Sequence, residues 1–66
     1  MSSREHDVRR IERHVRRGER HVLQQRAVVA ALELQGQPSK IALEVLAGLE
    51  QTLSNHKAHL DRLLAE

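Results

Sequence analysis

The fold is decided by a seven-residue repeat near the start of the chain. Val8-Arg9-Arg10-Ile11-Glu12-Arg13-His14 is followed directly by Val15-Arg16-Arg17-Gly18-Glu19-Arg20-His21, and six of the seven positions are identical. A seven-residue period with an apolar residue at the head of each copy is typical of coiled-coil helices. With Val8 at position a, one helix face carries the contact residues of a predicted seam, which are Val8, Ile11, Val15, Gly18, Val22, Gln25, Val29 and Leu32.

A single cluster of helix-breaking residues follows this helix, Gln35-Gly36-Gln37-Pro38-Ser39. Gly36 stands where a left-handed residue ends a helix, the proline cannot continue one, and Ser39 can cap the next. We therefore predict one domain over residues 1–66, with a first helix over about 3–35, a turn over about 36–39 and a second helix over about 40–64.

Ser2 and Glu5 have the S-x-x-E spacing of a capping box, which satisfies free amides at the start of a helix. The second helix has a seam of its own with alternating spacings of four and three. Its members are Ala42, Leu46, Leu49, Leu53, His56, Leu60 and Leu63. Because a short loop makes consecutive helices antiparallel neighbours, we predict an all-α, coiled-coil-like antiparallel helical hairpin.

The two seams also predict a register. Val22 is expected to meet Leu53, and Gly18 is expected to lie opposite His56, where the missing side chain leaves space for the imidazole. One flanking row then brings together two pairs of opposite charge, Glu19 with Lys57 and Arg26 with Glu50.

Composition excludes several function classes. The chain has 66 residues, no Cys and no Phe, Trp or Tyr. Disulfides, thiol nucleophiles and Cys-based zinc sites are therefore excluded, as is base stacking on aromatic rings. The few hydroxyls form no nucleophile motif and no Gly-rich loop is present, so we expect neither an enzyme nor a bound cofactor.

The chain's length and its apolar surface both favour self-association. In a domain this small, the free energy gained by burying apolar surface only about equals the conformational entropy lost on folding. Near the loop, even the positions outside the seam are apolar, and a two-helix unit cannot cover them alone. We predict a homodimeric four-helix bundle, or a higher bundle, with a monomer packed inside a larger partner as the alternative. The predicted interface includes Leu23, Ala27, Ala30, Ala31, Leu34, Ile41, Ala47 and Gly48.

Away from the loop, arginines fill the outer positions b, c and f of both heptads. Residues 1–26 hold eight Arg against four acids, although the net charge of the whole chain is only +2. The arginine stripe consists of Arg9, Arg10, Arg13, Arg16, Arg17 and Arg20. Arginine suits bidentate contacts with phosphate or carboxylate. We predict an adaptor or regulator that binds an acidic protein through this stripe, with sequence-nonspecific nucleic-acid binding as the alternative and plain solvation of the helix left open.

Histidines form a second unusual group. The predicted register places His14 opposite His59, with His56 one turn before His59 on the seam. Three imidazoles suit zinc, nickel or copper, so His14, His56 and His59 are a candidate metal site. A hydrogen-bonded polar edge, or an edge that senses acid near pH 6, is the other interpretation.

The sequence contains no recognisable secretory signal or membrane-spanning segment. The start of the chain has no apolar segment of the kind a secretory signal needs, and the longest apolar run, 27–32, is too short to cross a membrane. We expect a cytoplasmic protein without a transmembrane segment.

Several strings are typical of a known group of proteins. They are Gly18-Glu19-Arg20-His21-Val22, the following Gln25-Arg26, the Gln35-Gly36 turn, and the end from His56 to Asp61-Arg62-Leu63-Leu64. Together they resemble small uncharacterised bacterial two-helix proteins of similar length. That group implies a helical hairpin and brings no established activity. In architecture alone, the predicted dimer is also similar to Rop-type RNA-binding bundles, although the aromatic residue on their binding face is missing here.

Overall fold

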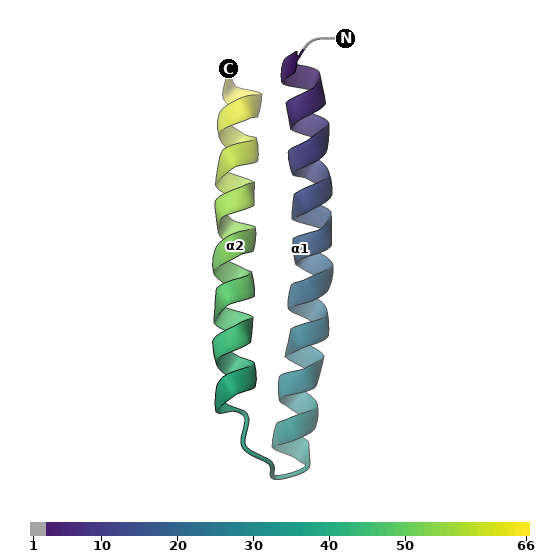
Figure 1. Ribbon diagram of the computed structural model, residues 1–66, viewed down its shortest axis with the longest axis vertical. Coiled ribbons are helices and arrows are strands. Elements are labelled where there is room, and N and C mark those ends of the chain that lie inside the picture. The colour runs from purple at the N-terminus through teal and green to yellow at the C-terminus, as the bar shows by residue number, and fades with distance from the viewer. Residues whose placement is uncertain (1–2) are drawn as a thin grey trace.

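The protein is a hairpin of two long helices. The structure, a computed structural model, describes residues 3–66. Helix α1 spans Ser3–Leu34 and helix α2 spans Lys40–Ala65, and they run side by side in opposite directions with both chain ends at the same end of the molecule (Figure 1). The hairpin measures 52 × 15 × 13 Å. The predicted all-α antiparallel hairpin is confirmed.

The end of α1 is a Schellman motif. Gly36 has a φ of 69°, in the left-handed region that glycine adopts without strain. Its amide donates to the carbonyl of Glu33 at 3.1 Å, and the amide of Gln37 donates to the carbonyl of Leu32 at 2.9 Å. The predicted conformation of Gly36 is confirmed, and α1 ends one residue before the predicted bound.

The start of α2 differs from the prediction. Ser39 occupies the N-cap position, but its side chain makes no capping hydrogen bond. Its backbone has φ −117° and ψ 5°, outside the extended conformation in which an N-cap side chain reaches back to the first amides. The predicted serine cap is therefore wrong, although the carbonyl of Ser39 accepts from the amide of Leu43 at 2.8 Å. The predicted capping box at the other helix involves Ser2, which lies outside the described residues.

The core is thin and comes mainly from α1. Ile11, Val22 and Val29 are 6%, 4% and 6% exposed, and α2 contributes no fully buried side chain. The other predicted seam residues of both helices are half-buried. Two helices meet along a single line, so most seam residues keep one flank open to solvent. The hairpin alone therefore buries little apolar surface.

The packing at Gly18 corrects one predicted contact of the register. A Cβ built on Gly18 would lie 3.1 Å from the Cδ1 of Leu53, and the nearest side chain is that of Leu53 rather than His56. Leu53 also lines a shallow depression with Val22. The leucine thus lies between two residues of α1, because side chains in coiled coils pack into the space between facing residues rather than directly opposite one of them.

Polar contacts join the helices at three levels. Near the loop, the Nε2 of Gln25 donates to the carbonyl of Ala42 at 2.9 Å in a partly buried position. In the middle, Arg26 and Glu50 form the predicted ion pair, with Nη2 and Oε2 3.1 Å apart. At the open end, Arg4 reaches across to the last turn of α2. These contacts set the axial position of one helix against the other.

Candidate interaction surfaces

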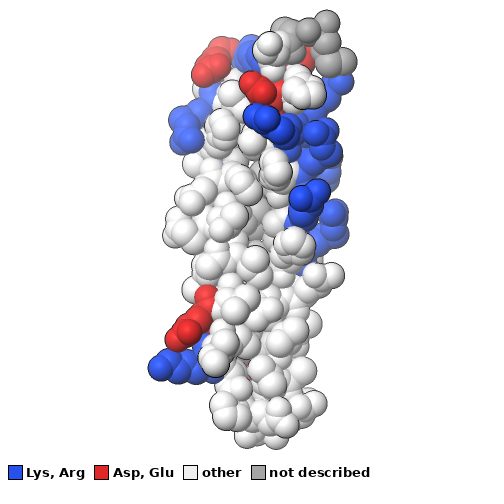
Figure 2. Space-filling view, viewed as in Figure 1, with Lys and Arg blue, Asp and Glu red and all other residues white. Residues whose placement is uncertain are grey.

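Charge divides the hairpin into two halves. The loop half, residues 23–49, contains only four charged residues, Arg26, Glu33, Lys40 and Glu44. Figure 2 shows the Lys and Arg side chains gathered over the half of the molecule where both termini lie, while the loop half is almost entirely white. The other described residues, 3–22 and 50–66, form the open half. Each half therefore presents a different kind of surface.

The arginine stripe lies on the open half and points to solvent. All six of its side chains are exposed, as their outer heptad positions require: Arg9, Arg10, Arg13, Arg16, Arg17 and Arg20. From Arg9 to Arg20 the helix rises about 17 Å at 1.5 Å per residue. A surface of this length spans several phosphates of a nucleic acid or about three turns of an acidic helix.

Carboxylates interrupt the stripe. Asp7 Oδ1 lies 3.4 Å from Nη2 of Arg10, and both side chains are about half exposed, at 42% and 53%. An ion pair at this distance and exposure contributes about 0–1 kcal/mol, so a ligand displaces it at little cost. Glu12 is half-buried and Glu19 is exposed. These carboxylates offset part of the positive charge, so the arginine stripe is a moderately basic surface.

The loop half exposes large apolar side chains. Leu34 is 92% exposed, Ile41 76% and Leu23 64%, and Val28, Leu43 and Val45 are close to half exposed. The predicted interface residues Ala27, Ala30, Ala31, Ala47 and Gly48 are exposed as well. Leu64 is the one large apolar residue among those exposed in the described chain that lies outside the loop half. A single hairpin leaves this apolar surface in water.

The two helical glycines have different surroundings. Gly18 faces Leu53, so its missing side chain has a reason within the hairpin. A Cβ built on Gly48 would meet nothing within 4 Å. Glycine inside a helix costs about 1 kcal/mol relative to alanine, and nothing in the hairpin itself offsets that cost at Gly48.

Two histidines meet across the helices. The rings of His14 and His56 have centroids 5.1 Å apart and planes tilted by 30°. The pKa of His14 lies below its ordinary value of 6.5 because its ring is desolvated, and because His56 and three guanidiniums add positive potential. Those three arginines are Arg17, Arg10 and Arg13.

The predicted metal site needs a third ligand. Within residues 3–66, no group of three or more His, Asp or Glu side chains is arranged to hold a metal ion. His14 contacts His56, one of the two histidines predicted to lie beside it. The histidine edge is an interhelical ring pair in a basic neighbourhood, and that neighbourhood repels cations.

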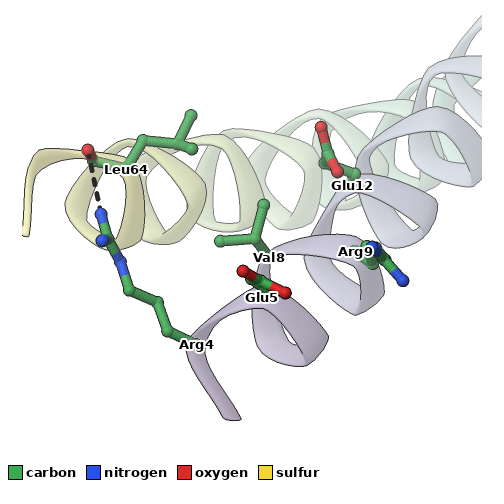
Figure 3. A pocket seen from close by; sticks show the side chains of 6 residues that line it. All are labelled: Arg4, Glu5, Val8, Arg9, Glu12 and Leu64. Atoms are coloured by element: carbon green, nitrogen blue, oxygen red, sulfur yellow. Dashed lines mark hydrogen bonds between the residues drawn. The ribbon is translucent and has the colours of Figure 1, made fainter. Parts of the chain in front are cut away.

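The open end holds a shallow depression of about 350 Å³. Figure 3 shows Arg4, at the start of α1, extending to the backbone at the end of α2. Its Nε and Nη2 donate to the carbonyl of Leu63 at 3.1 and 2.9 Å, and Nη2 also lies 3.4 Å from the carbonyl of Leu64. The last four carbonyls of a helix lack partners within it, and a cation at this end also suits the helix dipole. Arg4 therefore caps α2 from the other helix.

Sequence reasoning missed this cap and the Gln25 hydrogen bond. Gln25 stands out as the polar member of an otherwise apolar stretch of seam, and that position is the signal for a cross-helix hydrogen bond. Arg4 gave no comparable signal, because its partner carbonyls depend on where the second helix ends.

No family model, curated protein or solved structure matches this chain. The resemblance to small bacterial two-helix proteins therefore stays a prediction. No helix of the described chain combines the length and apolar character needed to cross a bilayer.

Proposed function

We propose that this protein is a small self-associating interaction protein, an adaptor or regulator, that presents the arginine stripe to an acidic protein partner in the cytoplasm. The observation that carries the proposal is the division of its surface. Six exposed arginines cover the open half, and most of the exposed large apolar side chains lie on the loop half.

Self-association explains the loop half. The buried core consists of three residues, all on α1, which is little apolar burial for a chain of this length. A second hairpin against the loop half supplies the missing burial. The open half is left free, because its arginines repel the arginines of another copy.

A protein partner suits the chemistry of the stripe. Many of its guanidiniums are three or four residues apart along α1. Asp or Glu side chains at the same spacing line one face of a partner helix. Bidentate pairing of guanidinium with carboxylate adds geometric specificity to charge attraction. The intervening carboxylates favour a patterned partner over a uniform polyanion.

A second candidate function is sequence-nonspecific binding of nucleic acid. The observation in its favour is that every base of the stripe is arginine and that no exposed apolar side chain lies among them. Protein interfaces usually place aromatic or apolar anchors at their centre, whereas a phosphate backbone needs only cations. The two candidates share one surface and differ in ligand.

Fluorescence anisotropy distinguishes them. The two labelled probes are a helical peptide with Glu at i and i+4 spacing and a 20-base-pair DNA duplex, each titrated at several salt concentrations. The first candidate predicts tighter binding of the peptide. The second predicts tighter binding of the duplex, with the logarithm of affinity falling by roughly 0.9 per phosphate contact for each tenfold rise in salt.

Two triple variants provide the matched comparison. Replacing Arg13, Arg16 and Arg20 with Gln removes three charges from the stripe. Replacing Lys40, Lys57 and Arg62 with Gln removes three exposed charges elsewhere. We expect the first variant to lose at least tenfold in affinity and the second less than threefold. Equal losses, or no binding of either probe at low salt, would contradict a ligand on the stripe.

A further inference from the structure

The arginine stripe borders two flanks of different chemistry. Residues are about 100° apart around a helix, so heptad positions e and g lie on opposite sides of the seam. Glu12 and Glu19 occupy position e of α1, next to the arginines at position b. Histidines occupy position g of both heptads, next to the arginines at position c, which are Arg10 and Arg17. One side of the stripe therefore faces carboxylates and the other faces imidazoles.

Contacts between the helices identify the side that carries acids. The ion pair between Arg26 and Glu50 joins the e positions of α1 and α2. Glu19 and Lys57 line a shallow depression on the same side, together with Arg26. We call this side the glutamate flank. Its carboxylates lie close to its basic side chains, which reduces the positive potential that a ligand meets there.

The opposite side is the histidine flank, which consists of Arg10, His14, Arg17, His21, His56 and His59. With Leu53 at position a of α2, the c and g positions over 10–21 of α1 and 52–62 of α2 contain no Asp or Glu. Beyond them lie Asp7, which pairs with Arg10 at 3.4 Å, and the terminal Glu66. The middle of this flank thus has basic groups from both helices and no carboxylate.

His14 lies at the centre of this flank. Its ring meets that of His56 across the helices, with centroids 5.1 Å apart. Desolvation lowers the pKa of His14, and the charged groups that lower it further are all basic: His56 from α2, and Arg17, Arg10 and Arg13 from α1. Charging both rings would place like charges side by side. The free hairpin therefore favours neutral imidazoles here.

An acidic ligand reverses this balance. Arg10, His14 and Arg17 follow one another at spacings of four and three residues, so their side chains are neighbours on one helix face. A carboxylate bound by the two arginines lies beside the imidazole, and an opposite charge within about 4–6 Å favours the protonated ring. By linkage, a ligand that strengthens proton binding is itself bound more tightly when protons are bound.

We propose that the acidic partner docks on the histidine flank and that its binding takes up protons at His14 and His56, so that its affinity rises as the pH falls toward about 6. This inference rests on the proposed function and adds the place of the partner on the stripe and its control by pH. An acidic segment fits because guanidiniums and protonated imidazoles both donate hydrogen bonds to carboxylates.

Anisotropy of the labelled Glu peptide at pH 8 and pH 6, at one salt concentration, tests the coupling in the full chain. Glutamates with a pKa of about 4.3 stay ionised at both values, so changes arise in the protein. Each proton taken up raises the association constant by up to tenfold per pH unit, and we expect at least about fivefold tighter binding at pH 6. Circular dichroism at both values checks that the hairpin is intact.

The double variant His14→Gln with His56→Gln removes the groups that take up protons. We expect its affinity to change by less than about twofold between pH 8 and pH 6. In the native chain, an NMR titration of the His14 ring should show its pKa rising when the peptide is bound. A pH-independent affinity, an unaltered pH dependence in the double variant, or a pKa of His14 that does not rise would overturn the inference and leave the acidic partner intact. No peptide binding at either pH would overturn the proposed partner as well.

Two pairs of arginines test the location. Arg10→Gln with Arg17→Gln removes two charges from the histidine flank, and Arg9→Gln with Arg16→Gln removes two charges beside the glutamate flank. All four side chains are exposed on the same turns of α1, so both variants are expected to fold. We expect the first pair to cost at least about tenfold in affinity for the peptide and the second less than about threefold. Equal losses, or a larger loss for the second pair, would place the partner elsewhere on the stripe and overturn the inference.

Discussion

The hydrogen bond from Gln25 to Ala42 gives a test of the helix register with an unusually close control. Gln25 is half-buried and donates from Nε2 to the carbonyl of Ala42 at 2.9 Å, whereas the neighbouring Gln24 is exposed. Gln25→Glu keeps the size of the side chain but replaces the donor with an acceptor. Gln24→Glu makes the same chemical change one position away, where the side chain points to water.

The expected cost follows from two contributions. Loss of the hydrogen bond costs about 1 kcal/mol, and partial desolvation of a carboxylate facing a carbonyl adds about another 1 kcal/mol. We therefore expect Gln25→Glu to lower the free energy of unfolding by about 2 kcal/mol at pH 7, and Gln24→Glu to change it by less than about 0.5 kcal/mol.

Urea unfolding followed by circular dichroism at 222 nm measures both variants at one fixed protein concentration. The chain has no aromatic residue, so the helical signal is the natural probe. Protonation of the carboxylate introduced by Gln25→Glu restores a donor at low pH, and the deficit relative to the native chain should shrink toward pH 4. Equal effects of the two variants, or a deficit independent of pH, would refute the role of Gln25 in fixing the register.

Three further predictions concern the open half of the hairpin. Because neutral His14 is favoured in the fold, protons bind the unfolded chain more strongly, and the melting temperature should fall as pH drops below about 6.5; His14→Gln should flatten that dependence between pH 8 and 5.5. Arg4→Ala should lower the free energy of unfolding by about 1 kcal/mol in urea titrations, because carbonyls at the end of α2 lose their donor. Gly18→Leu should lower the free energy of unfolding by about 2 kcal/mol in the same assay, since even a Cβ added at Gly18 would lie 3.1 Å from the Cδ1 of Leu53. An unchanged melting temperature from pH 8 to 5.5, or native stability in either substitution, would contradict the corresponding contact.

Much of the hairpin follows from periodicity and from one turn. Val8 and Val15, as heads of two nearly identical heptads, define the face of α1 that packs against α2, and the left-handed Gly36 ends that helix as its position indicates. These features were predictable because they depend on local sequence: the period of an α-helix and the conformational freedom of glycine.

Individual contacts that depend on small differences in the axial offset of the two helices were not predictable, although the ion pair Arg26–Glu50 was. The offset decides whether Gly18 lies against Leu53 or His56. Numbering alone fixes which residues share a face and is compatible with alignments that differ by about one turn. The side chain of Ser39 fails to cap for a similar reason, since its backbone follows the path of the loop.

The surface assignments follow from the sequence in a simpler way. The stripe arginines are exposed because they occupy outer heptad positions, and the loop half is apolar because few charged residues occur between Leu23 and Leu49. What binds each surface depends on a second molecule.

Sedimentation equilibrium of the native chain tests the central claim most directly. The account predicts a helical species of about 15 kDa, a symmetric dimer of the 7.6-kDa chain, across roughly 1–100 µM. A species of 7.6 kDa that keeps its full helical circular dichroism over that range would contradict it. The hairpin would then be stable with its apolar loop half in water.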